Sequence, residues 1–153
     1  MYTAFFDGSC EPRNPGGTAG YGAVIFKGGE RVWHHSGMIP ASPATSNNVA
    51  EYLAFITALD WFIGQRLTTA PIVIQGDSML VIKQCFGHWK IKKGLYAQYA
   101  IEAKNKVKKF SALQGKWISR EYNSLADELS RAAINRELEP GVSTANWADC
   151  FKA

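Results

Sequence analysis

Cysteine is scarce in this sequence, and its few positions form no recognisable pattern. The three residues, Cys10, Cys85 and Cys150, are odd in number and show neither CxxC nor Cys/His spacing. They therefore indicate neither a disulfide framework nor a zinc site. A reducing compartment is the simplest home for such a chain, so we expect a cytoplasmic protein.

Long hydrophobic runs are also missing. The first apolar stretch, residues 2–6, stops at Asp7. A segment that spans a bilayer needs about 20 apolar residues, so we expect neither a signal peptide nor a membrane partner. Internal repeats and low-complexity runs are absent as well.

What the sequence does contain is enough apolar material for one core. Its 153 residues are 46% hydrophobic, which suits a single domain. The stretch after Arg136 is polar and contains Pro140 and Gly141. We expect one domain over residues 1–136, a linker-like tail over residues 137–153, and a monomer.

Positive charge is distributed unevenly. The net charge is only +4, but lysines concentrate at positions 83, 90, 92, 93, 104, 106, 108, 109 and 116. A basic patch of this kind suits a polyanion, and it is equally typical of a solvated helix face. Charge alone leaves both interpretations open.

The apolar pattern predicts an α/β fold. We expect antiparallel strands over residues 1–6, 19–27 and 31–39, further strands over 71–75 and 117–118, and helices over 48–63, 79–86, 95–110 and 124–135. This order implies a mixed five-stranded sheet flanked by helices, with three antiparallel strands followed by parallel ones. Helical spacing is expected to place the following side chains inward: Ile101, Val107, Leu125, Leu129 and Ala133.

Four carboxylates, Asp7, Glu51, Asp77 and Asp127, occupy positions where a solvated acid would be unusual. Asp7 and Asp77 each end a short apolar run, and Glu51 is the only charged residue within residues 49–59. Burying an ionised carboxylate without a partner costs several kcal/mol or more. Because sites in such sheets lie beyond the carboxyl ends of the strands, we expect Asp7 and Asp77 there, joined by Glu51 from the first turn of its helix.

Clustered carboxylates repel one another, and a bound divalent cation resolves that repulsion best. An all-oxygen donor set favours Mg²⁺ or Mn²⁺ over zinc. Such sites often hold two ions that act on phosphate esters, so the predicted reaction is phosphodiester hydrolysis. In the alternative, purely structural interpretation, Asp7 and Asp77 act as caps and Asp127 interacts with a helix dipole. That alternative does not account for Glu51.

Four short motifs surround these acids: FDGS (6–9) with NPGG (14–17), SNNVAE (46–51), GDS (76–78) and REYNSLADELS (120–130). With these motifs, the chain resembles type 1 ribonuclease H over residues 1–134. A DGS tripeptide alone is weak evidence. Four motifs in the right order, each carrying its acid, are specific.

The resemblance implies a ribonuclease H-like fold and hydrolysis of the RNA strand of RNA/DNA hybrids, leaving 3′-hydroxyl and 5′-phosphate ends. It assigns catalysis and two Mg²⁺ or Mn²⁺ ions to the four acids. It assigns substrate contacts to Gly8, Ser9, Asn14, Gly16, Gly17, Asn47 and Asn48. Glycine backbone and Asn amides can approach a 2′-hydroxyl closely. Gly16 and Gly17 also suit a simple turn, and Asn47 also suits a helix cap.

Residues 87–94, here called the basic segment, look like short family members that lack a longer basic protrusion. We expect Trp89 to pack against a deoxyribose, and Lys90, Lys92 and Lys93 to contact phosphates of the DNA strand. A core position for Trp89 is the alternative.

The chain departs from the family pattern in one loop, residues 119–123, which has no His. Arg120 is the nearest candidate for an auxiliary residue, although a guanidinium does not shuttle protons near neutral pH. His34, His35 and His88 are expected to be structural or surface residues. Two alternatives therefore stay open: a nuclease that acts on duplex RNA or DNA structures, and a binding module without catalysis.

Overall fold

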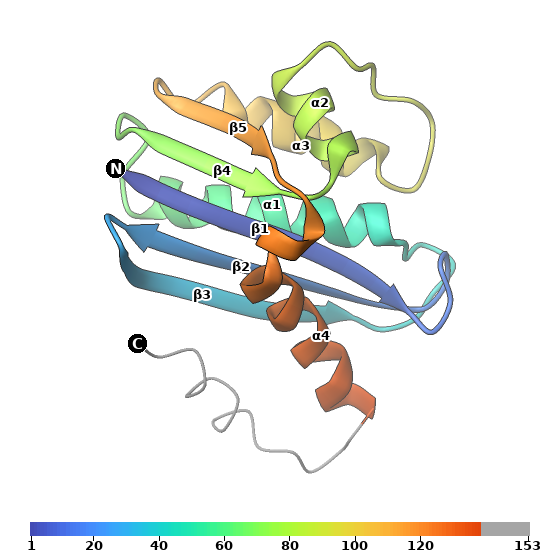
Figure 1. The fold of residues 1–153 in the computed structure, drawn as a ribbon. Helices are drawn as coiled ribbons and strands as arrows, with labels where there is room; N and C mark the ends of the chain where they lie inside the picture. Colours follow the sequence, from blue (N-terminus) through green and yellow to red (C-terminus); the bar gives the residue numbers. More distant parts are fainter. Residues whose placement is uncertain (139–153) are drawn as a thin grey trace.

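A single mixed sheet organises the chain (Figure 1). The computed structural model describes residues 1–138. The strands are β1 (Tyr2–Glu11), β2 (Thr18–Lys27), β3 (Glu30–Ile39), β4 (Ile72–Gly76) and β5 (Leu113–Trp117), in the order β3-β2-β1-β4-β5. The first three are antiparallel, and β4 and β5 run parallel to β1. The predicted five-stranded arrangement is confirmed.

The helices are α1 (Asn47–Gly64), α2 (Met79–Phe86), α3 (Ala97–Val107) and α4 (Ser124–Leu138), with a short 3₁₀ turn η1 (Arg120–Tyr122) before α4. Helices α1 and α4 pack against β1 and β2 from opposite faces of the sheet (Figure 1). Among the described residues, none of these helices combines the length and apolarity needed to cross a bilayer.

Helix α1 forms the centre of the core. Its buried residues lie on most sides of the helix, in keeping with a segment whose only charged residue between 49 and 59 is Glu51. Phe55 and Phe62 pack against Phe6 and Tyr2 of β1 through edge-to-face ring contacts. The Ser46 hydroxyl accepts a hydrogen bond from the Val49 N–H at 3.1 Å and caps the helix. The start of α1 is thereby fixed against the sheet.

Helix α4 approaches the opposite face closely. A Cβ atom added to Gly22 of β2 would lie 2.5 Å from Leu129 Cβ and 2.7 Å from the Ser130 nitrogen. Only glycine therefore permits this packing without a shift of the helix.

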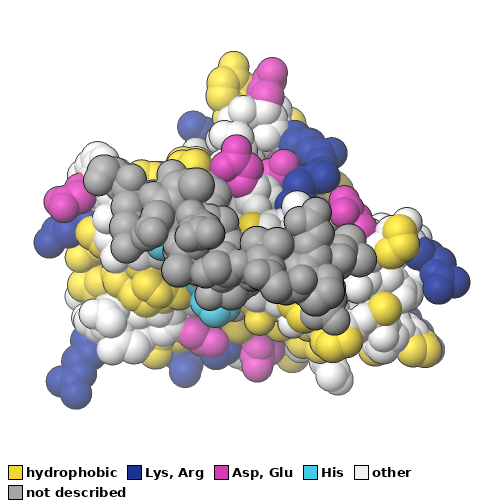
Figure 2. Space-filling model, turned by 90° about the horizontal axis from the view of Figure 1, so that it is seen from below, with side chains coloured by type: hydrophobic (Ala, Val, Ile, Leu, Met, Phe, Trp, Pro, Cys, Tyr) yellow, Lys and Arg dark blue, Asp and Glu magenta, His cyan; other side chains and the backbone are white. Residues whose placement is uncertain are grey.

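On the face of the molecule drawn in Figure 2, acidic and basic side chains are interspersed among hydrophobic ones.

Several boundaries and inward positions differ from the prediction. Strand β5 comprises residues 113–117 rather than 117–118, and α3 is shorter than predicted at both ends. Ile101 is 54% exposed because α3 faces the core through Ala100 and Ala103, one helical position away. The inward prediction for Leu125 was also wrong, because Leu125 is exposed and the buried stripe of α4 begins at the next residue, Ala126.

The other inward predictions are confirmed. Leu129 and Ala133 are buried, and Val107 packs against the core. Helix α4 runs to Leu138, two residues beyond the expected domain boundary. The rest of the predicted tail, residues 139–153, lies outside the described part of the chain.

Candidate active site

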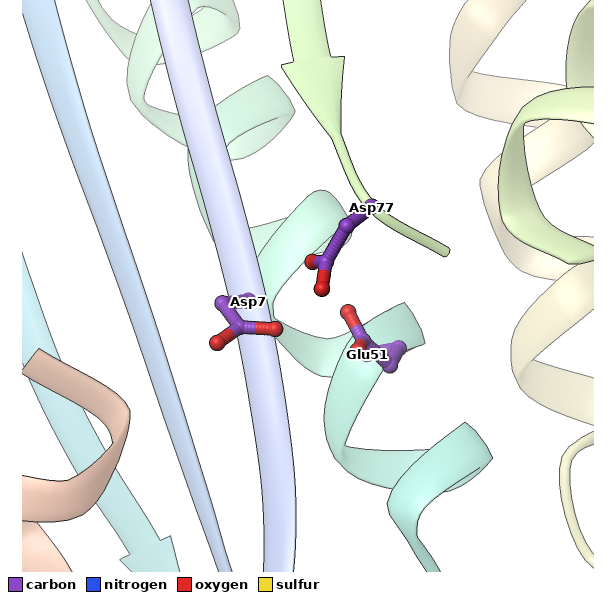
Figure 3. Close-up of side chains that lie close together, drawn as sticks. All are labelled: Asp7, Glu51 and Asp77. Atoms are coloured by element: carbon purple, nitrogen blue, oxygen red, sulfur yellow. The ribbon is translucent and has the colours of Figure 1, made fainter. Parts of the chain in front are cut away.

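Three carboxylates from separate segments meet at the carboxyl end of β4, beside the central strand β1 (Figure 3). Asp7 comes from β1, Glu51 from α1, and Asp77 follows β4 directly. One carboxylate oxygen from each lies within 4.8 Å of the others. The sequence-based expectation that these acids converge is confirmed.

The position of Asp7 along its strand differs from the expectation. Strand β1 continues to Glu11, and Asp7 pairs with Gly22 of β2. Only the parallel pairing with β4 ends here, at Phe6 and Gly76. Asp7 is therefore the first residue of β1 beyond the end of β4, because β2 supports the longer strand and β4 does not.

Close packing of α1 on β1 brings Glu51 beside Asp7. A Cβ atom added to Gly8 would lie 2.3 Å from the Glu51 nitrogen and 2.4 Å from the Ala50 carbonyl carbon. The absent side chain at Gly8 thus permits backbone contact between strand and helix. Glu51 is the fifth residue of α1, so it lies in the second turn and not the first.

Burial makes this cluster unfavourable for negative charge. Asp7 is 4% exposed and Glu51 is 8% exposed. Burial, followed by the charge of Asp77, raises the pKa of Asp7 to about 8. Burial and the charge of Asp7 raise the pKa of Glu51 well above its usual value. Among the described residues, Glu51 Oε2 is one of two buried side-chain oxygens without a hydrogen-bond partner. The three acids could hold a divalent cation, which would supply the missing positive charge and a partner for this oxygen.

The fourth acid, Asp127, lines the same pocket and contributes to the raised pKa of Asp7, but it is not one of the three acids whose oxygens lie within 4.8 Å of one another. Its Oδ1 accepts a hydrogen bond from Arg131 Nε at 3.1 Å, and Arg120 Nη2 lies 3.9 Å away. Arg131 Nη1 also lies 3.4 Å from Glu11 Oε1. The guanidinium of Arg131 therefore links Asp127 of α4 to Glu11 of β1.

Two residues that support the acids were not predicted from the sequence. Asn123 is buried, and its Nδ2 donates to Asp77 Oδ1 at 3.0 Å and to the Phe6 carbonyl at 2.9 Å. It thus joins the loop before α4 to both β1 and the Asp77 carboxylate. Arg131 is the second, and its i,i+4 spacing from Asp127 was a usable signal. Asn123 offered none, because a polar residue in a polar loop is ordinary.

The pocket around the acids, here called the carboxylate pocket, collects several predicted substrate residues. It is lined by Gly8, Ser9, Asn47, Asn48 and Arg120 together with the four acids. Asn14 lies outside this lining but is tied to it, since Asn14 Nδ2 donates to Asn47 Oδ1 at 2.9 Å. In return, the Asn47 backbone N–H donates to Asn14 Oδ1 at 3.0 Å.

Gly16 and Gly17 belong to the loop that carries Asn14. Gly16 has φ of +101°, which favours glycine, and lines a separate shallow hollow with Arg13 and Pro43. A Cβ atom added to Gly17 would lie 2.3 Å from the Arg13 carbonyl oxygen. Both glycines therefore have a structural requirement in addition to any contact with substrate.

The basic segment borders a second hollow, here called the lysine hollow. It is lined by Leu80, Gln84, Trp89, Lys90, Lys92 and Tyr96. Trp89 is 49% exposed, so its core alternative is wrong. Lys93 is exposed but is not part of this lining. Leu80 also lines the carboxylate pocket, so the two hollows adjoin.

The three histidines lie away from the acids. His34 and His35 are half-buried on β3, where the His35 ring contacts Tyr21 and Trp33. His88 is exposed on the basic segment. Among the described residues, none of the three lines the carboxylate pocket, as expected of structural or surface residues.

Comparison with known proteins gives concordant matches. The sequence profile of the family described as "Reverse transcriptase-like" matches residues 5–133. The crystal structure of LC11-RNase H1 in complex with RNA/DNA hybrid, a protein isolated from compost by a metagenomic approach, is similar with a TM-score of 0.79. The two chains are 31% identical, and the match covers 91% of this chain and 100% of the other.

Two further relatives have named organisms. RNase H1 from Halobacterium salinarum is similar with a TM-score of 0.75 and 30% identity, covering 88% of this chain and 97% of that one. The bifunctional protein Rv2228c of Mycobacterium tuberculosis is 31% identical over 139 residues, which are 88% of this chain. The chain spans only 36% of the length of that relative.

Proposed function

Because the chain belongs to the type 1 ribonuclease H family, we propose that it hydrolyses the RNA strand of RNA/DNA hybrids at the carboxylate pocket. The observation that carries this proposal is the cluster of Asp7, Glu51 and Asp77, with one oxygen from each within 4.8 Å of the others. Two of these acids are buried, and the pKa of each is raised. Burying such a cluster is costly unless protons or cations neutralise its charge, and carboxylates with perturbed pKa values in a pocket are typical of functional sites.

The donor set fits divalent cations. All four acids offer oxygen ligands only, which suits Mg²⁺ or Mn²⁺, and the four together would hold two ions. When bound, the ions would activate the attacking water and stabilise the leaving oxygen, which yields 3′-hydroxyl and 5′-phosphate ends. Asp7 and Glu51 would release their protons on binding, since ligating carboxylates are ionised.

Neighbouring residues orient the acids for this role. Asn123 holds Oδ1 of Asp77 and leaves the second oxygen of that carboxylate for a ligand. Arg131 acts in the same way on Oδ1 of Asp127. Such supporting hydrogen bonds typically affect metal affinity or activity by about 10- to 100-fold.

Arg120 lines the carboxylate pocket and is the nearest candidate for an auxiliary residue in the loop that carries a His in many family members. Its side chain is exposed and its Nη2 lies 3.9 Å from Asp127 Oδ1. A guanidinium stays charged near neutral pH, so Arg120 would attract a phosphate and would not carry a proton. Proton transfer at the leaving oxygen would then fall to water.

The two sides of the site suit the two strands of a hybrid. Gly8, Ser9, Asn48 and the joined pair of Asn14 and Asn47 would face the RNA strand. Backbone and amide groups there can act as both donor and acceptor, as reading a 2′-hydroxyl requires. On the other side, the exposed Trp89 and the lysines of the basic segment would contact the sugar-phosphate backbone of the DNA strand.

The test is cleavage of end-labelled RNA/DNA hybrid, duplex RNA and single-stranded RNA of one sequence, in Mg²⁺ and in Mn²⁺. We expect cleavage of the hybrid's RNA strand, with 5′-phosphate on the products, and loss of cleavage in Asp7→Asn. Equal cutting of duplex RNA would contradict the hybrid specificity. Binding of hybrid with no cleavage in either cation would favour a binding module instead.

A further inference from the structure

The basic segment has neither helix nor strand, although it carries three of the exposed lysines. Its amino-terminal end is fixed by backbone hydrogen bonds from Gly87 N and Trp89 N to the Lys83 carbonyl, at 3.0 and 3.2 Å. At Lys90 and Lys92 the backbone is held by side chains of the adjoining helix and turn, and at Gly94 the carbonyl accepts from the Ala97 N–H at 3.2 Å. The side chains that make these bonds therefore determine where the lysines lie.

Gln84 of α2 makes the central contact. It is 1% exposed, and its Nε2 donates to the Lys90 carbonyl at 3.0 Å and to the Tyr96 hydroxyl at 3.3 Å. The Tyr96 hydroxyl in turn accepts from the Lys92 backbone N–H at 3.4 Å. One buried amide thus holds the chain at Lys90 directly and at Lys92 through Tyr96.

The other end of the Gln84 amide is anchored to α1. Its Oε1 accepts from the Tyr52 hydroxyl at 2.5 Å. A tyrosine hydroxyl carries its proton near neutral pH, and here it donates that proton to the amide oxygen. The Lys90 carbonyl can only accept, which requires the amide nitrogen to face the basic segment and the amide oxygen to face Tyr52.

This bridge joins the two sides of the site. Tyr52 is the residue after Glu51 on α1, and its ring stacks on Tyr96 with centroids 6.0 Å apart. The same helix therefore carries a cluster acid and, through Gln84, the backbone that presents Lys90 and Lys92. Burying an amide costs free energy unless its hydrogen bonds are made. An apolar side chain could fill the same space, so packing alone does not explain a glutamine here.

We propose that Gln84 is a positioning residue for substrate binding: it holds Lys90 and Lys92 at a fixed place relative to the carboxylate pocket, so that both contact the DNA strand of one bound hybrid. This inference rests on the proposed function. Gln84 itself touches no substrate. Its loss releases the basic segment without changing the acids.

The test compares the same substitution at two glutamines. Gln84→Met keeps a side chain of similar length but loses the hydrogen bonds to the Lys90 carbonyl and the Tyr96 hydroxyl. Gln98→Met is the matched control, because Gln98 is exposed on α3 and lines neither hollow. Hybrid affinity is measured for both in the Asp7→Asn background, where no cleavage interferes.

We expect Gln84→Met to weaken hybrid binding by about 5- to 20-fold and to reduce the slope of log affinity against log salt by about one phosphate contact. Gln98→Met is expected to stay within about twofold. In the cleaving protein, Gln84→Met should raise KM by the same factor and leave kcat within about twofold. Equal binding by the two variants, or a fall in kcat without a change in KM, would overturn the proposal.

A third variant covers the case in which Gln84→Met does not fold. Tyr96→Phe removes only the hydroxyl that accepts from Lys92 N, and it should weaken binding in the same direction by a smaller factor. Unchanged affinity in Tyr96→Phe would then contradict the proposal. If the Asp7→Asn protein binds no hybrid at all, the proposed function fails and the inference fails with it. If it binds hybrid and Gln84→Met binds equally well, only the inference fails.

Discussion

The two adjoining hollows hold their charges in opposite ways. In the carboxylate pocket, Asp7 and Glu51 are buried, and each belongs to a long regular element. In the lysine hollow, Lys90 and Lys92 are exposed, and they stand on a segment without regular structure. Fixed carboxylates suit bond breaking, because small displacements of a catalytic group lower the rate strongly. Lysine side chains only have to reach phosphates, so they can remain mobile while Gln84 holds their backbone in place.

Glu51→Gln should give the largest effect and would separate the hollows most clearly. The substitution preserves shape but removes the buried negative charge that the cations require. We expect hybrid cleavage to fall by about a thousandfold or more, with hybrid affinity changed far less. The measurement is single-turnover cleavage together with binding.

Glu102→Gln on α3 is the control, because Glu102 is exposed and lines neither hollow. Its activity should match that of the unmodified protein. A Glu51→Gln protein that cleaves at more than a tenth of the normal rate would contradict the assignment of Glu51.

Asn123→Ala should show how far the carboxylate pocket depends on its supports. The substitution leaves Asp77 Oδ1 and the Phe6 carbonyl without their shared donor. We expect cleavage to fall by about 10- to 100-fold and the free energy of unfolding to fall by about 1–3 kcal/mol. Asn135→Ala, at an exposed position of α4, should change neither quantity. An unchanged requirement for Mg²⁺ in Asn123→Ala would argue against support of Asp77.

The acids also predict how the stability of the metal-free protein depends on pH. The pKa of Asp7 rises on folding from 3.8 to about 8, so the folded state keeps a proton that the unfolded state releases between these values. The free energy of unfolding should therefore fall as pH rises from about 4 to 8. Asp7→Asn should flatten this slope and stabilise the protein at pH 8 by about 1–3 kcal/mol. Denaturant unfolding in the presence of a chelator measures it, and stability that rises over this range would refute the account of the cluster.

Lys92→Ala should have the smallest effect, and it sharpens the contrast from the other side. Loss of one phosphate contact should weaken hybrid binding by a few-fold and lower the salt slope by about one contact. Lys27→Ala, on the exposed end of β2 and outside both hollows, should leave the slope unchanged. Equal slopes for the two variants would remove the lysine hollow from the binding surface.

The fold and the acids could be predicted because both depend on local pattern. Apolar runs marked the strands, and Glu51 stood out as one charge in an apolar helix. Asp7 was placed at a strand end because the sequence does not show that β2 supports β1 further than β4 does. The placement of Ile101 failed by one helical position, since a stripe of small alanines faces the core instead.

The supporting residues could not be predicted in the same way. Asn123, Arg131 and Gln84 are polar residues in unremarkable surroundings along the chain. Their roles come from partners far away in sequence, such as Phe6 for Asn123 and Tyr52 for Gln84. Only Arg131 had a local signal, and it became meaningful once the position of Asp127 in the pocket was known.

If the carboxylate pocket performs hydrolysis and the lysine hollow binds the DNA strand, substitutions in the two hollows should change different kinetic constants. The rate of hybrid cleavage against hybrid concentration in Mg²⁺ measures both constants, for the unmodified protein, Asp7→Asn and Lys92→Ala side by side. We expect loss of kcat in Asp7→Asn, and a raised KM with kcat unchanged in Lys92→Ala. Normal kcat in Asp7→Asn, or a loss of kcat in Lys92→Ala as large as that in Asp7→Asn, would contradict this division of roles.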